Sequence, residues 1–326
     1  MDYPTLSRTI EGFLLHISAA GRSHNTIRNY RMDLNRFSNW LNDLRIDAVE
    51  SKHIEEFLSY MKNDYRITHV GIRKIITPRS LSKKSLHNIH GCLAVFWKWA
   101  SAEFQLPNPF KVPHIKYYPK PIAPLTEKEV EALLVACKSI KKQPEHRKGY
   151  SSTRTTYKRD KAIILTLLDT GMRVSELCDL KVKDYTQESS RLMVTGKGSK
   201  TRFVYLGKVS SQSLWSYLLE RFPSHQPDPE DPLFAERLGI HSLTRTNVLN
   251  LIKRLGVKAE VKDVYPHKFR HTFAVQFLRN GGNVFELQQL LGHSDITMVR
   301  RYVQLAQIDL ERSAKRASPA DRWRLR

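Results

Sequence analysis

The stretch YPHKFRHTFAVQFLRNGGNVFELQQLLGHSDITMVRRY, residues 265–302, decides how this chain is organised, because it holds polar and nucleophilic side chains where a structural segment would hold apolar ones. Pro266 suits the first turn of a helix. His267, Arg270 and His271 then fall at i, i+3 and i+4, so they share one face of that helix. The sequence therefore predicts a helix that presents two imidazoles and a guanidinium on the same side.

Two further short helices are expected in the same stretch. The glycines at 281–282 end the first helix, residues 284–291 form the second, and Gly292 closes it with the residue type favoured just past a helix end. His293 then lies in a turn. A third helix opens just after it and carries Tyr302 about two and a half turns downstream. We expect two histidines, an arginine and a tyrosine to lie near one another.

Length and composition favour an intracellular protein of two domains. The chain has 326 residues, of which 40% are hydrophobic, enough for two ordinary cores. It has no run of 18 apolar residues and no basic-then-apolar N-terminus, so we expect a cytoplasmic protein without a membrane partner. Cys92, Cys137 and Cys178 are odd in number, far apart and set in apolar helical patterns, which predicts buried free thiols rather than a disulfide or metal site.

The net charge of +22 is the strongest bulk signal, because it is spread along the chain instead of being confined to one tail. A polyanion is the expected partner. Nucleic acid is favoured over a membrane surface, since no amphipathic anchor helix stands out.

Residues 1–106 are predicted to be an all-helical domain. Apolar residues recur at helical spacing over 6–19, 23–41, 51–65 and 82–103. The aromatic cluster of Phe96, Trp97 and Trp99 is assigned to the core rather than to base stacking. Basic side chains on the opposite faces and at a helix entry suit phosphate contacts; the DNA-binding candidates here are Arg28, Arg31, Arg36, Lys83 and Lys84.

A proline-rich linker is expected at 107–124, with six prolines and no long apolar period. The second domain covers 125–326 and begins with a helix capped by Thr126. Residues 138–161 are basic and almost free of large aliphatic side chains, which predicts a long surface loop. A disordered insertion and a DNA-contacting loop are equally consistent with its composition.

Two further motifs precede residue 265. TGMRVSEL, residues 170–177, places Arg173 just past a glycine turn and Glu176 one helical turn later; on spacing alone, a surface ion pair is the simpler interpretation. RLMVTGKGSKTRFVYL, residues 191–206, has two β-rich runs around a glycine-containing loop, which predicts a hairpin. Lys197 lies at its tip, where a mobile cation can reach a phosphate.

Taken jointly and in order, TGMRVSEL, the GKGSK hairpin, HKFRHTFA, LLGHS and the final tyrosine resemble the tyrosine recombinases, the integrase family that includes Xer-type and Cre-type enzymes. The resemblance covers nearly the whole chain, although the helical half matches more weakly. It implies a mainly α fold with a small β-hairpin or sheet in the C-terminal domain. A helical SAM-like core-binding domain and an α+β integrase-type catalytic domain would form a C-shaped clamp on DNA.

The resemblance also implies a role for each matching residue. Arg173 and Arg270 would clamp the charge that develops on the scissile phosphate, because a guanidinium is a planar, permanently charged fork. Tyr302 would be the nucleophile, and its unperturbed pKa of about 10 means that it needs activation. His267 would be the general base.

Lys197 would be the general acid that protonates the leaving 5′ oxygen, and His293 would bond the phosphate. Glu176 would support the site, and Lys200 and Arg202 are added to the DNA-binding candidates. His271 has no counterpart among the family's functional residues and is assigned either to packing or to supporting the neighbouring site residues. The product would be a 3′-phosphotyrosyl linkage formed without metal or cofactor.

The partners implied are double-stranded DNA recombination sites and three further copies of the chain in a synaptic tetramer, with accessory DNA-binding proteins as an addition. Residues 303–326 would dock on a neighbouring subunit, although a frayed terminus is an equally economical interpretation of the last eight residues. The biological outcome would be integration, excision or resolution of a DNA element such as a transposon.

Three alternatives are considered. Residues 284–304 resemble a helix-turn-helix, which would make the chain a non-catalytic regulator, but this leaves Arg173, Lys197 and the HxxR pair unexplained. A zinc hydrolase would use His267 and His271, but Lys268 stands where its catalytic glutamate is needed. A type IB topoisomerase shares the implied chemistry, and the two-domain length favours a recombinase over it.

Overall fold

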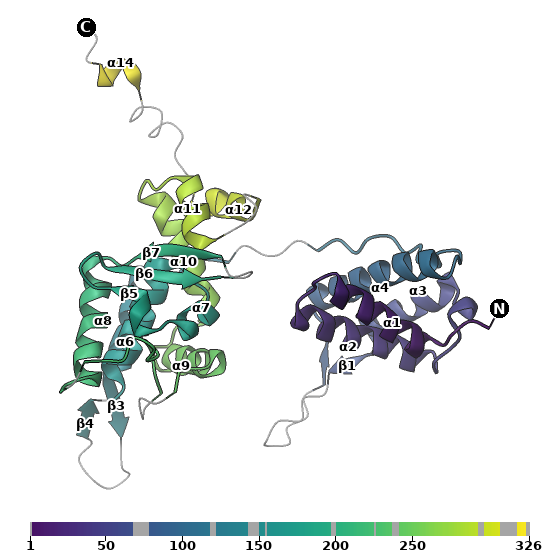
Figure 1. Cartoon of the computed structure of the whole chain (residues 1–326), viewed down its shortest axis with the longest axis horizontal. Helices are drawn as coiled ribbons and strands as arrows, with labels where there is room; N and C mark the ends of the chain where they lie inside the picture. Colours follow the sequence, from purple (N-terminus) through teal and green to yellow (C-terminus); the bar gives the residue numbers. More distant parts are fainter. Residues whose placement is uncertain are drawn as a thin grey trace. The chain divides into compact units, whose positions relative to one another are not determined.

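The structure, a computed structural model, describes residues 2–67, 78–117, 122–142, 150–153, 155–196, 200–224, 226–236, 241–292, 297–306 and 318–323. The chain divides into two compact units, Met1–Lys120 and Pro121–Arg326 (Figure 1). The division falls inside the proline-rich stretch. Each unit is described by itself below.

The N-terminal unit is a helical bundle with one small two-stranded ladder. Its elements are α1 (Leu6–Ala19), α2 (His24–Trp40), the 3₁₀ turn η1 (Ile46–Ala48), α3 (Ser51–Asn63), β1 (Arg66–Ile67), β2 (Arg79–Ser80) and α4 (Lys83–Glu103). Ser23 and Ser82 cap α2 and α4, each accepting a backbone N–H three residues on. Phe96 and Trp97 are fully buried in the core, which confirms the packing expected for the aromatic cluster.

The first part of the predicted linker lies against this unit. His87 Nδ1 donates to the carbonyl of Ile115 at 2.8 Å, and His90 Nε2 donates to that of Pro113 at 3.0 Å. Phe110 packs edge-on against the His90 ring. Residues 107–117 are therefore held on α4 through histidines that the composition of the linker did not predict.

The C-terminal unit combines helices with a three-stranded antiparallel sheet in the order β5-β6-β7. Its elements are α5 (Glu127–Lys138), β3 (Ser139–Lys142), β4 (Tyr150–Thr153), α6 (Tyr157–Thr170), α7 (Val174–Asp179), η2 (Val182–Asp184), β5 (Tyr185–Thr186), β6 (Arg191–Thr195), β7 (Thr201–Tyr205), α8 (Lys208–Arg221), α9 (Arg245–Lys258), α10 (Pro266–Arg279), α11 (Val284–Leu291), α12 (Thr297–Ala306) and α14 (Pro319–Arg322).

Helix α6 forms the centre of this unit. Ile163, Ile164 and Leu167 are fully buried, and α6 packs against α5, α8 and α10. Leu192 of β6 pairs with Val204 of β7, and both side chains point into the same core. The predicted hairpin is confirmed here, since β6 and β7 pair from Arg191–Tyr205 to Thr195–Thr201.

The expected loop over 138–161 is replaced by regular structure at both of its ends. Strands β3 and β4 pair antiparallel from Ser139–Thr153 to Lys142–Tyr150, and α6 already begins at Tyr157. The density of charge hid a strand pattern in which isoleucine, tyrosine and threonine supply β propensity. Residues 143–149, between the two strands, lie outside the described part of the chain.

A second, smaller core joins α10, α11 and α12. It is formed by Ala274, Val275, Leu278, Leu287, Leu291, Val299, Tyr302 and Ala306. The three cysteines are buried and, within the described part of the chain, form no disulfide, as predicted. Among the described helices, none has the length and apolar character needed to cross a bilayer.

Candidate active site

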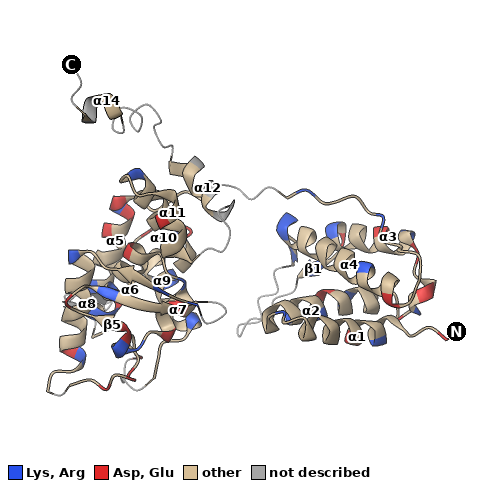
Figure 2. Ribbon diagram, turned by 45° about the horizontal axis from the view of Figure 1, so that its top comes forward, with Lys and Arg blue, Asp and Glu red and all other residues tan. Residues whose placement is uncertain are grey.

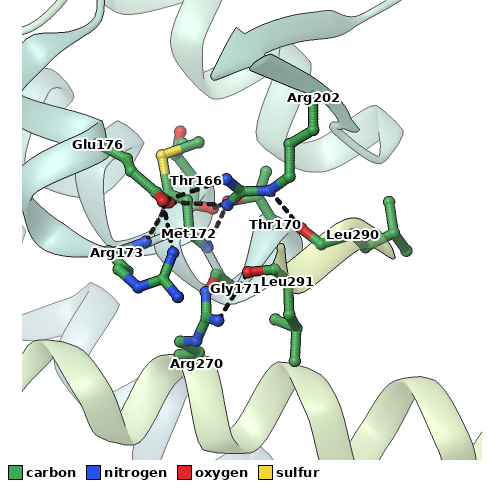
Figure 3. Close-up of polar contacts among 10 residues, drawn as sticks. All are labelled: Thr166, Thr170, Gly171, Met172, Arg173, Glu176, Arg202, Arg270, Leu290 and Leu291. Carbon is green, nitrogen blue, oxygen red and sulfur yellow. Dashed lines mark hydrogen bonds and ion pairs between the residues drawn. The ribbon is translucent and has the colours of Figure 1, made fainter. Parts of the chain in front are cut away.

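Arg270 lies at the centre of the site and is almost completely buried on α10. Its Nη1 donates to the carbonyl of Gly171 at 2.8 Å and its Nη2 to the carbonyl of Leu291 at 2.8 Å (Figure 3). Burial, followed by the nearby Arg173, lowers the pKa of Arg270 to about 10. The group therefore keeps its charge at neutral pH and is fixed between the end of α6 and the end of α11.

Gly171 makes this arrangement possible. It ends α6 in the left-handed conformation with φ at +57°, which exposes its carbonyl to Arg270. A Cβ added at this position would meet Cδ1 of Phe273 at 2.4 Å. Only glycine satisfies both the backbone conformation and the close approach of α10.

Glu176 is the buried carboxylate that organises the arginines around Arg270. It accepts from the backbone N–H and from Nη1 of Arg173, both at 2.8 Å. It also accepts from Arg202 through Nη1 at 3.1 Å and Nη2 at 2.7 Å (Figure 3). Burial acts to raise the pKa of Glu176, but the bonds from Arg202 and Arg173 outweigh it and lower the pKa below its usual value. An ionised carboxylate thus holds two guanidinium groups in place.

Arg173 remains within reach of a ligand, whereas Arg202 does not. The side chain of Arg173 is 38% exposed and that of Arg202 is 13% exposed. Arg202 also donates from Nε to the carbonyl of Leu290 at 2.7 Å, which links β7 to α11. The structure therefore places Arg202 inside the domain rather than on the DNA-facing surface expected for it. Strand alternation carried this signal, because Arg202 shares the inward face of β7 with Val204.

The helix predicted from Pro266 brings together the second group of site residues. Tyr265 precedes α10 in an extended conformation and Pro266 occupies its first turn, as the sequence indicated. The rings of His267 and His271 lie 5.3 Å apart between centroids. The ring of Tyr302, on α12, lies 5.4 Å from that of His271. Tyr302 is 5% exposed, and His267 is exposed.

His271 is the residue of this group that sequence reasoning assigned to packing or to a supporting position behind the site residues. Its ring lies against both His267 and Tyr302. Burial, followed by the positive neighbours His267 and Arg270, lowers its pKa to about 4. It is therefore a neutral imidazole at physiological pH. Its place one turn after His267 was visible in the sequence as an i, i+4 pair.

Two predicted site residues, Lys197 and His293, lie outside the described residues. Lys200 is exposed on the C-terminal side of the hairpin, where its carbonyl accepts the N–H of Gly196 at 2.8 Å. Among the described residues, no three His, Cys, Asp or Glu side chains gather as metal ligands would.

The candidates in the N-terminal unit fall into two groups. Arg28, Lys83 and Lys84 are exposed. Arg31 pairs with Glu11, and Arg36 pairs with Asp33 while lying 5.5 Å from the centre of the Tyr65 ring. Figure 2 shows that lysines and arginines lie on both units, in keeping with the net charge.

Comparison with known proteins places both units in one family. Residues 124–308 match the Phage integrase family, and residues 10–68 match the Phage integrase, N-terminal SAM-like domain. The chain is 32% identical over 302 residues to the tyrosine recombinase XerD of Chlamydia pneumoniae, covering 91% of each chain. It is 31% identical over 317 residues to the tyrosine recombinase XerA of Thermococcus kodakarensis, covering 95% of each.

Solved structures agree on the fold. The integrase of the transposon Tn1549, in complex with circular intermediate DNA, aligns with a TM-score of 0.69 at 22% identity, covering 92% of this chain and 95% of that chain. The XerH site-specific recombinase, bound to palindromic difH substrate, aligns with a TM-score of 0.65 at 20% identity, covering 91% and 80%.

A SAM-like helical domain followed by an integrase-type catalytic domain defines a recombinase that acts through a tyrosine. The chain belongs to the phage integrase family and is a tyrosine recombinase, an enzyme of site-specific DNA recombination. Neither the helix-turn-helix regulator nor the type IB topoisomerase is favoured by these comparisons. The fold expected from the resemblance, mainly α with small sheets in two domains, is confirmed.

Proposed function

We propose that Tyr302 attacks the scissile phosphate and becomes joined to the 3′ end of the cleaved strand, with Arg173, Arg270 and His267 as its partners. The observation that carries this proposal is the convergence of α7, α10 and α12 on one site. The ring of Tyr302 on α12 packs beside that of His271 on α10, which in turn lies next to the ring of His267. One turn along α10, Arg270 is fixed beside the Arg173–Glu176 pair.

Each side chain has a task that its chemistry suits. In-line attack on a phosphodiester builds charge on the non-bridging oxygens, and two fixed guanidinium groups stabilise that charge without reorganising. His267 takes the phenolic proton as the O–P bond forms. Lys197 delivers a proton to the 5′ oxygen, and His293 bonds the phosphate; the resemblance supports these two roles. The linkage retains the energy needed for a partner strand's 5′ hydroxyl to complete the exchange.

The proposed binding partner is double-stranded DNA that carries recombination sites. A net charge of +22 supports it, as do exposed basic residues in the N-terminal unit such as Arg28 and Lys83. Clamping of the duplex by both units would make log affinity fall with log salt at a slope of about −0.9 per neutralised phosphate. A slope near zero in a filter-binding titration would contradict the clamp.

We also propose that four copies assemble on two sites through the segment that follows α12, residues 307–326, because residues 303–306 belong to α12 and Ala306 packs in the core of its own domain. A groove of about 610 Å³ on the catalytic unit supports this proposal. Its lining is apolar at Phe273 and Phe277 and acidic at Asp169 and Glu286, which suits a basic, tryptophan-containing segment. Truncation after Leu310 should spare binding to one site and weaken synapsis; unchanged synapsis would remove this role. We propose further that accessory DNA-binding proteins take part in assembly and that the protein is cytoplasmic.

The nucleophile is tested by Tyr302→Phe, with Tyr205→Phe as the matched control because Tyr205 is exposed on β7. Tyr302→Phe should bind DNA like the unmutated protein and form no covalent adduct, since only the attacking oxygen is lost. Tyr205→Phe should retain adduct formation. A protein–DNA linkage that persists in Tyr302→Phe would assign the nucleophile elsewhere.

A further inference from the structure

His271 occupies a position between the proposed base and the proposed nucleophile. Its ring centroid lies 5.3 Å from that of His267, with the planes 37° apart, and 5.4 Å from that of Tyr302, with the planes 56° apart. It is only partly exposed. A change in this ring would therefore affect both His267 and Tyr302, the two groups proposed to take part in the first proton transfer.

The Nδ1 atom of His271 is buried and has no hydrogen-bond partner among the described residues. Leaving a buried polar atom unsatisfied destabilises the folded state, and a phenylalanine would pack a ring here without that cost. Such an atom calls for a functional explanation. The geometry thus indicates that this nitrogen serves a purpose that packing does not supply.

The charge state of His271 restricts the role that its Nδ1 atom can have. The pKa of His271 is lowered to about 4, first by burial and then by His267 and Arg270. A neutral imidazole has one N–H donor and one acceptor nitrogen. With the proton on Nε2, Nδ1 offers a lone pair inside the site and brings no competing positive charge.

We propose that His271 is a positioning residue for cleavage, which orients His267 by accepting its ring N–H at Nδ1 in the DNA-bound enzyme. This inference rests on the proposed roles of His267 and Tyr302. A histidine base works best when one nitrogen faces the proton it removes and the other is fixed by a third group. His271 is that third group, and its ring also holds the phenol of Tyr302 in place.

The proton count is simple. The O–H bond of Tyr302 breaks as its oxygen bonds to phosphorus, and the proton moves to the free nitrogen of His267. The electron pair of the breaking P–O bond stays on the 5′ oxygen, which takes a proton from the proposed acid. His271 gains and loses no proton, and its accepted hydrogen bond stabilises the imidazolium of His267.

Two substitutions distinguish the contribution of the His271 ring from that of its acceptor nitrogen. His271→Phe keeps a ring and removes the acceptor, whereas His271→Asn removes the ring and keeps an acceptor, since the side-chain oxygen of asparagine is bonded to Cγ as Nδ1 is. Formation of the covalent adduct on a nicked suicide substrate should slow by roughly 10- to 100-fold in His271→Phe, the size of loss typical when the partner that orients a metal-bound histidine is removed. His271→Asn should recover most of that rate.

Duplex affinity should match the unmutated protein in both variants. The melting temperature of His271→Phe should not fall, because the ring is kept and the unsatisfied nitrogen is removed. Full-rate cleavage by His271→Phe, or equal slowing in both variants, would overturn the acceptor role and leave packing alone. Tyr302→Phe separates this failure from that of the proposed function, because an adduct in that variant would refute the nucleophile itself. In the unmutated protein, ¹⁵N shifts should show His271 with Nδ1 unprotonated from pH 6 to 8; protonation at Nδ1 would refute the inference without any substitution.

Discussion

Arg202 donates hydrogen bonds to the carboxylate of Glu176 from both terminal nitrogens, at 3.1 and 2.7 Å. The same carboxylate holds Arg173, which the proposed mechanism uses on the phosphate. A bidentate pair of this kind fixes geometry as well as charge. We therefore expect Arg202 to influence the reaction from inside the domain, through Glu176.

Replacing Arg202 by methionine should destabilise the protein, because a buried carboxylate loses its bidentate partner. We expect Arg202→Met to lower the free energy of unfolding by about 3 kcal/mol, at the low end for a broken buried ion pair, as measured by urea denaturation. The matched control is Lys181→Met, which breaks an exposed pair with Glu230 and should leave the midpoint unchanged. Equal effects of the two substitutions would show that burial of the Glu176–Arg202 pair adds nothing to the free energy of unfolding.

The same carboxylate should give the catalytic unit a stability that is lost in acid. The pKa of Glu176 is lowered below its usual value of 4.5 in the folded state, so the unfolded chain binds the proton more readily. This contribution is fully present above about pH 4.5 and disappears as pH falls through the lower folded value. Glu176→Gln should flatten the dependence of the melting temperature on pH in this range, and Glu188→Gln, at an exposed position, should not.

Gly171→Ala should damage both stability and cleavage. The new methyl group would lie 2.4 Å from the Phe273 ring, and the strained backbone would move the carbonyl that accepts from Arg270. Gly21→Ala is the matched control, since Gly21 also has positive φ but has nothing within 4 Å of the added carbon. That control should show only the backbone strain of roughly 1 to 2 kcal/mol in its own domain. A Gly171→Ala enzyme that cleaves at the normal rate would refute the need for this turn.

Lys197→Ala should slow cleavage by roughly 10²- to 10⁴-fold if Lys197 is the general acid. A substrate with sulfur in place of the bridging 5′ oxygen releases a thiolate, which leaves without a proton. Lys197→Ala should therefore cleave that substrate nearly as fast as the unmutated protein does. Arg173→Ala should gain no such rescue, because its charge acts on non-bridging oxygens. Equal rescue of both variants would make Lys197 a phosphate-positioning cation and turn attention to Lys200.

Cleavage should proceed at its normal rate in excess chelator. The reason lies in the two guanidinium groups, which supply at the phosphate the positive charge that divalent ions supply in other phosphoryl-transfer enzymes. The measurement is single-turnover adduct formation with and without EDTA at constant ionic strength. A rate that collapses in EDTA and returns with a divalent ion would require a metal in the reaction.

The sequence predicted well those parts of the fold that local rules decide. Pro266, the helical spacing of the HxxR histidine and arginine, and Gly171 after an apolar run each specify a helix boundary or face on their own. The hairpin of β6 and β7 was visible for the same reason, since β-rich runs flank a glycine loop. These features depend on a few neighbouring residues.

Features that depend on contacts between distant segments were harder to predict. Arg202 was counted as a DNA-binding candidate because its partner Glu176 lies 26 residues away, although strand alternation placed it on the inward face of β7. The β3–β4 ladder was hidden because charge, rather than alternation, dominates residues 138–161. The position of His271 against Tyr302 depends on how α12 packs on α10, which no local pattern specifies.

Burial of Tyr302 in the small core of α10, α11 and α12 has a consequence for biosynthesis. The residues proposed to cleave DNA are widely separated in the sequence. The last of them, Tyr302, emerges from the ribosome well after the N-terminal bundle. Arg270 needs Leu291 to complete its bonds, and Tyr302 needs α10 to be seated. We therefore expect a nascent or truncated chain that ends before α12 to be unable to cleave DNA, because it lacks the proposed nucleophile.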